Sequence, residues 1–96
     1  MLQIENRHFV LVQKILSKHP YQFYAYGSRA KEKASKTSDL DICYYEDIPN
    51  SVFSDIEEEF TESDLPFEVE LVAWKNMRPA IQKLIKKDLI LISALS

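Results

Sequence analysis

The sequence predicts a single α/β (α+β) domain that spans residues 1–96. Three short segments have the aromatic or alternating apolar character of strands, at 21–26, 40–45 and 67–73. Apolar residues recur at helical spacing between and around these segments. Hydrophobic residues make up 46% of the 96 residues, which suffices for one core in a chain near the lower end of domain size.

The first predicted element is an amphipathic helix over residues 3–18. Ile4, Leu11 and Ile15 recur at helical spacing, and charged residues separate them. The helix is expected to end at His19–Pro20, because the residue before a proline is disfavoured in helical backbone geometry. The first strand, 21–26, follows this break.

A short helix or turn is expected over residues 28–34, followed by a polar loop over 35–38 and the second strand over 40–45. Asn50 or Ser51 is expected to cap a helix that runs to about Thr61.

The third predicted strand, 67–73, alternates cleanly. Phe67, Val69 and Leu71 fall on one face, whereas Glu68, Glu70 and Val72 fall on the other. A last helix is predicted over 76–88 with Asn76 as a possible cap, and residues 89–92 form either a short extra strand or a docking tail.

Composition argues against several classes of protein. The net charge of −3, from 12 basic and 15 acidic residues, disfavours direct nucleic-acid binding as the main role. No apolar run approaches the roughly 20 residues of a membrane span, and the N-terminus lacks the order of a signal peptide. The single cysteine, Cys43, has no internal disulfide partner, which fits the cytoplasm.

The only glycine, Gly27, directly follows the first predicted strand and precedes Ser28. Glycine permits a sharp turn and a close approach of the backbone to a ligand. Ser28 is expected to start a short helical segment, where free backbone N–H groups and the helix dipole favour a phosphate. This turn is therefore a candidate phosphate-binding site.

Asp39 and Asp41 lie two residues apart at the start of the second predicted strand. Strand side chains alternate, so both carboxylates are expected on one face, with Leu40 and Ile42 on the other. Two adjacent carboxylates repel each other unless a cation lies between them. Carboxylates together with substrate phosphates are the ligand set that Mg²⁺ prefers.

Gly27-Ser28, nine residues, and then Ser38-Asp39-Leu40-Asp41-Ile42 resemble the signature of the DNA polymerase β-type nucleotidyltransferase superfamily. The small size resembles the minimal nucleotidyltransferase (MNT) group, the antitoxin halves of HEPN/MNT pairs. The resemblance implies a small mixed sheet with helices mainly on one face. It also implies nucleotidyl transfer from ATP with two Mg²⁺ ions, held by Asp39 and Asp41.

The superfamily places a third acidic residue, usually aspartate, in a later strand. Glu70, within Val69-Glu70-Leu71-Val72, occupies that place and would bind metal or accept a proton. Its carboxylate reaches one methylene further than that of aspartate, which bears on activity because such sites tolerate errors of only about an ångström. Glu68 faces the same way and remains an alternative third carboxylate.

The resemblance further implies that the nucleotide is bound by Gly27, Ser28, Arg29 and Ser38. The Arg29 fork suits phosphate oxygens, and Ser38 is expected to orient the turn before Asp39. The implied partner is a HEPN-domain RNase toxin, and the implied reaction transfers AMP from ATP to one of its tyrosines. The alternative is a non-catalytic antitoxin that neutralises the toxin by direct binding. A small-molecule acceptor is disfavoured, because the sequence shows no second domain to hold it.

Overall fold

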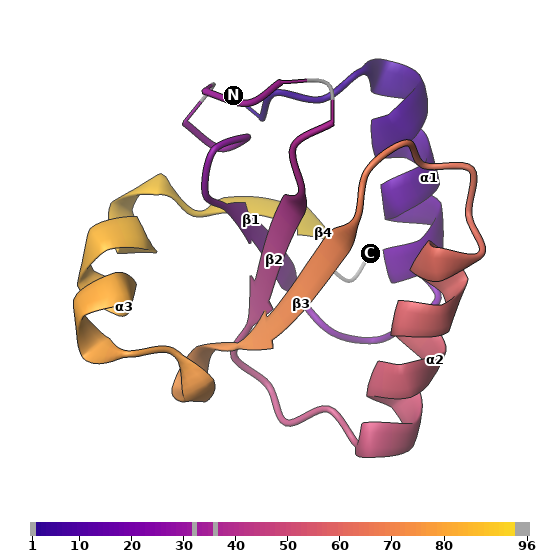
Figure 1. Ribbon diagram of the computed structural model, residues 1–96. Coiled ribbons are helices and arrows are strands. Elements are labelled where there is room, and N and C mark those ends of the chain that lie inside the picture. Colours follow the sequence, from indigo (N-terminus) through magenta and orange to yellow (C-terminus); the bar gives the residue numbers. More distant parts are fainter. Residues whose placement is uncertain (1, 32, 36, 94–96) are drawn as a thin grey trace.

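The structure is a computed structural model that describes residues 2–31, 33–35 and 37–93 (Figure 1). The elements run in the order α1 (Asn6–Leu16), β1 (Phe23–Tyr26), β2 (Leu40–Tyr44), α2 (Asn50–Thr61), β3 (Val69–Ala73), the 3-10 helix η1 (Trp74–Asn76), α3 (Pro79–Ile85), the 3-10 helix η2 (Lys86–Asp88) and β4 (Ile90–Ser93). This arrangement confirms the predicted α+β class. The ends of the chain, Met1 and residues 94–96, lie outside the described residues, as do Glu32 and Lys36 within the predicted turn and loop.

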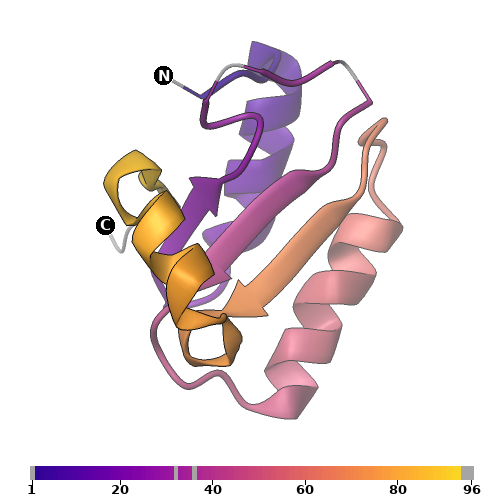
Figure 2. The ribbon, with the colours of Figure 1, turned by 60° about the vertical axis from the view of Figure 1, so that its left-hand side comes forward.

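The described strands form one mixed sheet in the order β3-β2-β1-β4. β2 and β3 are parallel and are connected through α2, whereas β1 runs antiparallel to both of its neighbours, β2 and β4. Figure 2 shows β1, β2 and β3 side by side, with α3 in front of the sheet and α1 behind it. The parallel pair places the starts of β2 and β3 at the same edge as the end of β1.

The core lies between the sheet and the two longer helices, α1 and α2. Leu40 and Ile42 of β2 are fully buried. They belong to one apolar cluster with Leu16 of α1 and Ile56 of α2. Burial of each such side chain contributes about 1.5–3 kcal/mol. The cluster fixes β2 as the central strand of the domain.

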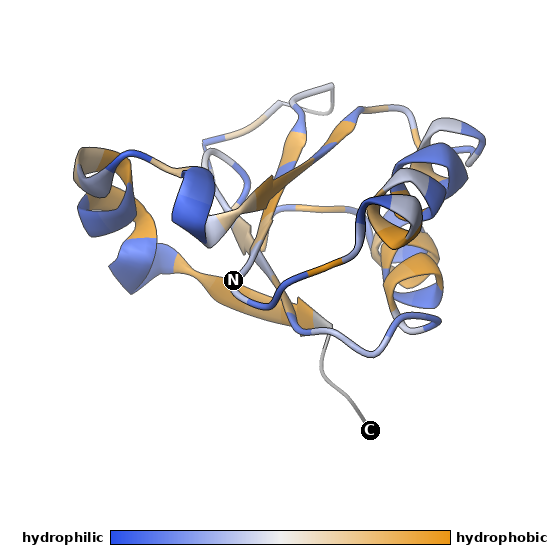
Figure 3. Ribbon diagram, turned by 90° about the horizontal axis from the view of Figure 1, so that it is seen from below, coloured by the Kyte–Doolittle hydropathy of each residue, from blue (hydrophilic) through white to orange (hydrophobic). Residues whose placement is uncertain are grey.

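The opposite face of the sheet is covered less completely. Viewed from below, α1 and α2 lie on one side of the sheet and α3 lies on the other (Figure 3). Only Ile85 of α3 is buried, whereas Ile81 and Leu84 are exposed. No described helix has the length and apolar character that a membrane crossing requires. We call this second side of the sheet, which carries the alternate side chains of the strands, the open face.

The helix predicted over 3–18 is shorter at both ends, since α1 covers Asn6–Leu16. Gln3 does not join it, because the Gln3 N–H donates to the carbonyl of Arg29 at 2.8 Å. The predicted cap of α2 is wrong: the helix already begins at Asn50, after Pro49, and has no side-chain cap.

The last predicted helix, 76–88, is divided into η1, α3 and η2. Pro79 starts α3 at its first turn, and Arg78 before it has an extended backbone, so Asn76 is not the cap. Of the two alternatives for residues 89–92, the strand is confirmed: β4 pairs with β1.

Candidate active site

Gly27 links β1 to the loop before β2, and two separate constraints require a glycine there. Its φ is 80°, in a region that side chains rarely adopt. A Cβ atom at this position would also collide with Oδ2 of Asp41. The Asp41 carboxylate therefore points toward the Gly27 backbone.

The chain turns through one helical turn directly after Gly27. The N–H of Ala30 donates to the Gly27 carbonyl at 3.1 Å, and the N–H of Lys33 donates to the Ser28 carbonyl at 2.8 Å. Ser28 stands half-buried at the start of this turn. The predicted helix or turn over 28–34 is thus a turn in its described part, and its first N–H groups belong to the residues after Gly27.

The acidic residues come together through the pairing of the strands. Asp41 is in register with Tyr26 of β1 on one side and with Glu70 of β3 on the other. Neighbouring strands lie about 4.8 Å apart, and paired residues project from the same face. Asp39 lies two residues before Asp41, just ahead of β2, and is exposed. The open face therefore carries two adjacent carboxylates beside the glycine turn, with a third at the edge.

Burial and like charges make this site electrostatically unfavourable when it holds only protein groups. The pKa of Asp41 is raised to about 6, first by burial and then by the negative charges of Glu70 and Asp39. The pKa of Tyr26 is raised to about 12 by burial and by the charges of Asp41 and Glu70. A cation among these groups would relieve the repulsion.

Two comparisons with known proteins agree on the family. A model of the polymerase beta nucleotidyltransferase domain matches residues 11–94. The chain is also 34% identical over 95 residues to "Probable protein adenylyltransferase MntA" of Haemophilus influenzae, an alignment that covers 95% of this chain and 83% of that protein. The chain belongs to the polymerase beta-type nucleotidyltransferases.

A nucleotidyltransferase of this family works with a nucleoside triphosphate and a divalent metal. Within the described residues, no group of three His, Cys, Asp or Glu side chains is arranged to hold an ion by itself. Magnesium is usually bound by only one or two carboxylates, and substrate phosphates and water supply its other ligands. The pair Asp41 and Glu70, with Asp39 nearby, fits that chemistry, and the metal would be bound together with the nucleotide.

The structure distinguishes the two glutamates proposed for the third carboxylate. Glu70 is the residue paired with Asp41, and its charge acts on the pKa of Asp41. Glu68 precedes β3, where its carbonyl accepts a hydrogen bond from the Leu40 N–H at 2.9 Å, and it lines a cavity with Asp39 and Pro66. Glu70 is therefore the glutamate beside Asp41, and its role as the third carboxylate stays a prediction.

The side chains of Arg29 and Ser38 are engaged within the protein. Arg29 is only 4% exposed, and its Nε and Nη2 donate to the Ser38 carbonyl at 3.0 and 2.8 Å. The Ser38 Oγ accepts a hydrogen bond from the Ser35 N–H at 3.0 Å, which agrees with its expected role in orienting the turn before Asp39. These contacts support a structural role for Arg29, while the phosphate contact inferred from its fork remains a prediction.

One residue of this region was missed by reasoning from the sequence. Gln3 was assigned to the first helix, whereas the structure places it against the loop between Gly27 and Asp39. No local pattern marks it, because its partners, Arg29 and Ala34, lie 26 and 31 residues away in the sequence.

Proposed function

We propose that this chain is a Mg²⁺-dependent adenylyltransferase that transfers AMP from ATP to a tyrosine of a partner HEPN-domain RNase toxin. The protein would thereby act as the antitoxin of a pair and form a hetero-oligomer with its target in the cytoplasm. One observation carries the proposal: Gly27, Asp41 and Glu70 converge on the open face in a chain related to a protein named a protein adenylyltransferase.

In the proposed reaction, the tyrosine oxygen attacks the α-phosphorus of ATP. A bond forms between that oxygen and phosphorus, the bond between the α-phosphorus and the bridging oxygen breaks, and pyrophosphate leaves. The metal ions, when bound, supply positive charge that stabilises the phosphates. Asp39 and Asp41 hold and orient the metal-bound nucleotide, and Glu70 binds metal or accepts the proton of the tyrosine.

The glycine turn serves the triphosphate in this scheme. The Gly27 backbone lies against the Asp41 carboxylate with no side chain between them, so a triphosphate at the turn would lie next to a metal ion on that carboxylate. Ser28 donates its hydroxyl and backbone hydrogen bonds to the outer phosphates. The site lies on the less covered face of a small domain, which fits an acceptor delivered by another protein.

A second candidate function rests on the position of Glu70. It replaces the usual aspartate, and its longer side chain is exposed. A displaced carboxylate would weaken catalysis, and the chain would then neutralise its partner by binding alone.

One experiment separates the two functions. The chain is mixed with Mg²⁺, labelled ATP and a small helical protein that carries an Arg-x(4–6)-His motif and is encoded beside it. Label on the partner that disappears with the double substitution Asp39→Ala and Asp41→Ala supports the enzyme. Tight association without label, with neutralisation that survives the double substitution, supports the binder. Glu70→Asp is a further probe, because a rise in transfer would show that the longer side chain is a handicap.

A further inference from the structure

The loop between Gly27 and Asp39 must hold its two ends in a fixed relation, because one end turns beside the phosphates and the other carries a metal-binding carboxylate. The side chain of Arg29 joins these ends. The guanidinium of Arg29, next to Ser28, donates through Nε and Nη2 to the carbonyl of Ser38, next to Asp39, at 3.0 and 2.8 Å. Burial lowers the pKa of Arg29, and the negative charge of Asp39 partly offsets this effect.

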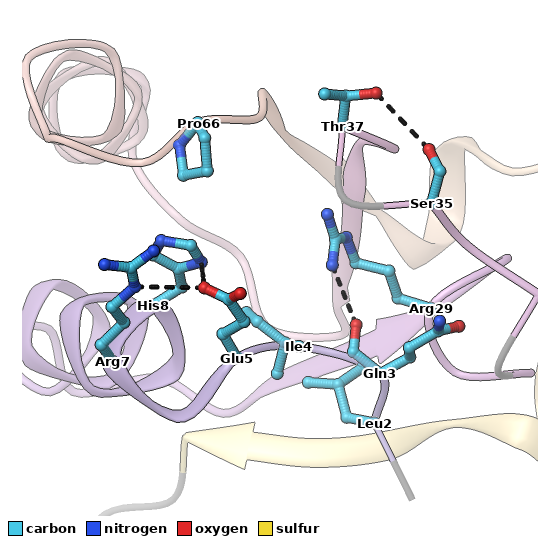
Figure 4. A pocket seen from close by; sticks show the side chains of 10 residues that line it. All are labelled: Leu2, Gln3, Ile4, Glu5, Arg7, His8, Arg29, Ser35, Thr37 and Pro66. Carbon is cyan, nitrogen blue, oxygen red and sulfur yellow. Dashed lines mark hydrogen bonds and ion pairs between the residues drawn. The ribbon is translucent and has the colours of Figure 1, made fainter.

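Arg29 is itself held from two further sides. Its Nη1 donates to the Gln3 carbonyl at 2.9 Å, and the Gln3 N–H donates back to the Arg29 carbonyl at 2.8 Å. The guanidinium carbon lies 4.2 Å from the centre of the Phe67 ring, a stacking contact that favours a planar cation. Figure 4 shows Arg29 directed toward Gln3 at the edge of a cavity of about 530 Å³.

The side chain of Gln3 fastens the middle of the same loop. Its Nε2 donates to the Ala34 carbonyl at 2.8 Å, and its Oε1 accepts from the Ala34 N–H at 2.9 Å. These two hydrogen bonds resemble the pair that two backbone amide groups exchange in an antiparallel sheet. Among the described residues, Gln3 therefore makes four hydrogen bonds to Arg29 and Ala34, two through its backbone and two through its side chain.

We propose that Gln3 and Arg29 form a clamp that positions the Gly27–Ser28 turn relative to Asp39, and that both are positioning residues for nucleotidyl transfer. The inference rests on the proposed nucleotide and metal site. A misplacement of about 1 Å in a reacting geometry is worth about 10²-fold in rate. In this proposal Gln3, which lies outside the motif in the sequence, helps to set the geometry of the motif.

The clamp gives Arg29 a different role from a phosphate ligand, and the two roles predict different mutant behaviour. A phosphate ligand of this kind also uses the planar guanidinium, so Arg29→Lys would weaken it as well, but it does not depend on Gln3. The clamp depends on the fork, which lysine lacks, and on Gln3. Gln3→Met removes the two side-chain hydrogen bonds to Ala34, keeps the backbone hydrogen bonds to Arg29 and changes no charge, and it should lower activity in the same way as Arg29→Lys.

The test compares the wild type with Gln3→Met, Arg29→Lys and the double variant, with Gln13→Met on the exposed side of α1 as the matched control. Steady-state transfer and calorimetric binding of a non-hydrolysable ATP analogue with Mg²⁺ are measured on the folded fraction of each. We expect each single variant to lose at least about 10-fold in kcat/KM, with a raised KM for ATP, and the double variant to lose little more. Normal kinetics of folded Gln3→Met, or losses that simply multiply, would overturn the clamp.

A second readout does not require activity. Nuclear magnetic resonance follows the amides of Gly27, Ala34 and Asp39 in the wild type and in Gln3→Met. We expect faster hydrogen exchange at Ala34 and shifted signals for Gly27 and Asp39, while Gln13→Met leaves all three unchanged. Unchanged signals at Gly27 and Asp39 would overturn the clamp. Failure of the wild type to bind the nucleotide would instead overturn the proposed function, and the amide signals would still decide the clamp.

Discussion

β2 presents two unlike faces to the rest of the molecule. Leu40 and Ile42 point into the core between the sheet and the helices, and both are fully buried. Asp41, which lies between them, points to the open face beside the Gly27 turn and Glu70. Neighbouring residues of one short strand therefore have different roles: Leu40 and Ile42 stabilise the core, and Asp41 belongs to the candidate active site.

The comparison shows how a small domain combines stability with a charged site. The apolar face stabilises the fold, whereas the charge on the open face opposes it, as the raised pKa of Asp41 indicates. Because β2 is held between β1 and β3, the backbone keeps the carboxylates together despite their repulsion. Functional sites commonly retain such unfavourable groups at the expense of stability.

The largest expected effect comes from Asp41→Asn. We expect transfer to fall by at least ~10³-fold, about 4 kcal/mol in activation free energy, because the metal-bound nucleotide loses a central carboxylate. The free energy of unfolding should change by no more than about 1 kcal/mol, since relief of the repulsion among the carboxylates offsets the other effects of the substitution. Transfer assays and urea unfolding test both statements. The control is Asp55→Asn, at an exposed residue of α2. A large loss of stability with activity intact would contradict the metal role.

The adjacent substitution Ile42→Ala should have the opposite profile. It leaves a cavity in the fully buried core and should lower the free energy of unfolding by about 2–5 kcal/mol. Transfer per folded molecule should stay near that of the wild type. Ile81→Ala, at a side chain that is 42% exposed, is the matched control and should stay within about 0.5 kcal/mol. Equal effects of the two isoleucines on stability would contradict the assignment of the core.

Gly27→Ala should affect both the stability of the fold and the candidate active site. An alanine at a φ of 80° is strained by about 1–2 kcal/mol, and its Cβ collides with Asp41. We expect reduced stability together with loss of nucleotide binding. In an Asp41→Ala background the collision disappears and only the backbone strain remains, so the stability losses should be less than additive in urea unfolding. If the stability losses of Gly27→Ala and Asp41→Ala were strictly additive, the Asp41 carboxylate could not lie against Gly27.

The smallest expected effect concerns a contact between α2 and the residues that follow the end of α1. Glu59 of α2 accepts hydrogen bonds from Lys18 and His19 at 2.8 and 3.0 Å, and these lower its pKa below the ordinary 4.5, with the Lys18 contact as the main cause. A carboxyl with a lowered pKa stabilises the fold above its unfolded pKa, and this contribution is lost as the pH falls through the folded value.

Glu59→Gln should therefore lower stability at pH 7 by less than about 1 kcal/mol, because the pair is near the surface. The difference from the wild type should shrink as the pH falls below the ordinary 4.5 and through the lowered pKa of the folded state. Thermal unfolding at several pH values measures it, with Glu58→Gln as an exposed control on the same helix. A difference that persists unchanged at pH 3 would show that the ion pair is not its source.

Reasoning from the sequence was most successful where the signal is local. Strand alternation placed Asp41 opposite Leu40 and Ile42, and the spacing of the motif led to the family that the comparisons show. It failed where elements depend on distant partners or on details of backbone geometry. The strand nature of β4 stayed open until its pairing with β1 was known, and the division of the last predicted helix at Pro79 was not foreseen.

The sequence by itself determined the glycine turn, the spacing of the two aspartates and the face on which Asp41 projects. These three features depend on the backbone geometry of a few consecutive residues, so the local sequence is enough to predict them. Only the tertiary structure decided that Glu70 lies beside Asp41 and that Gln3 reaches the loop held by Arg29. Both depend on contacts between residues more than 25 positions apart, whose formation is governed by packing of the whole domain rather than by any local pattern.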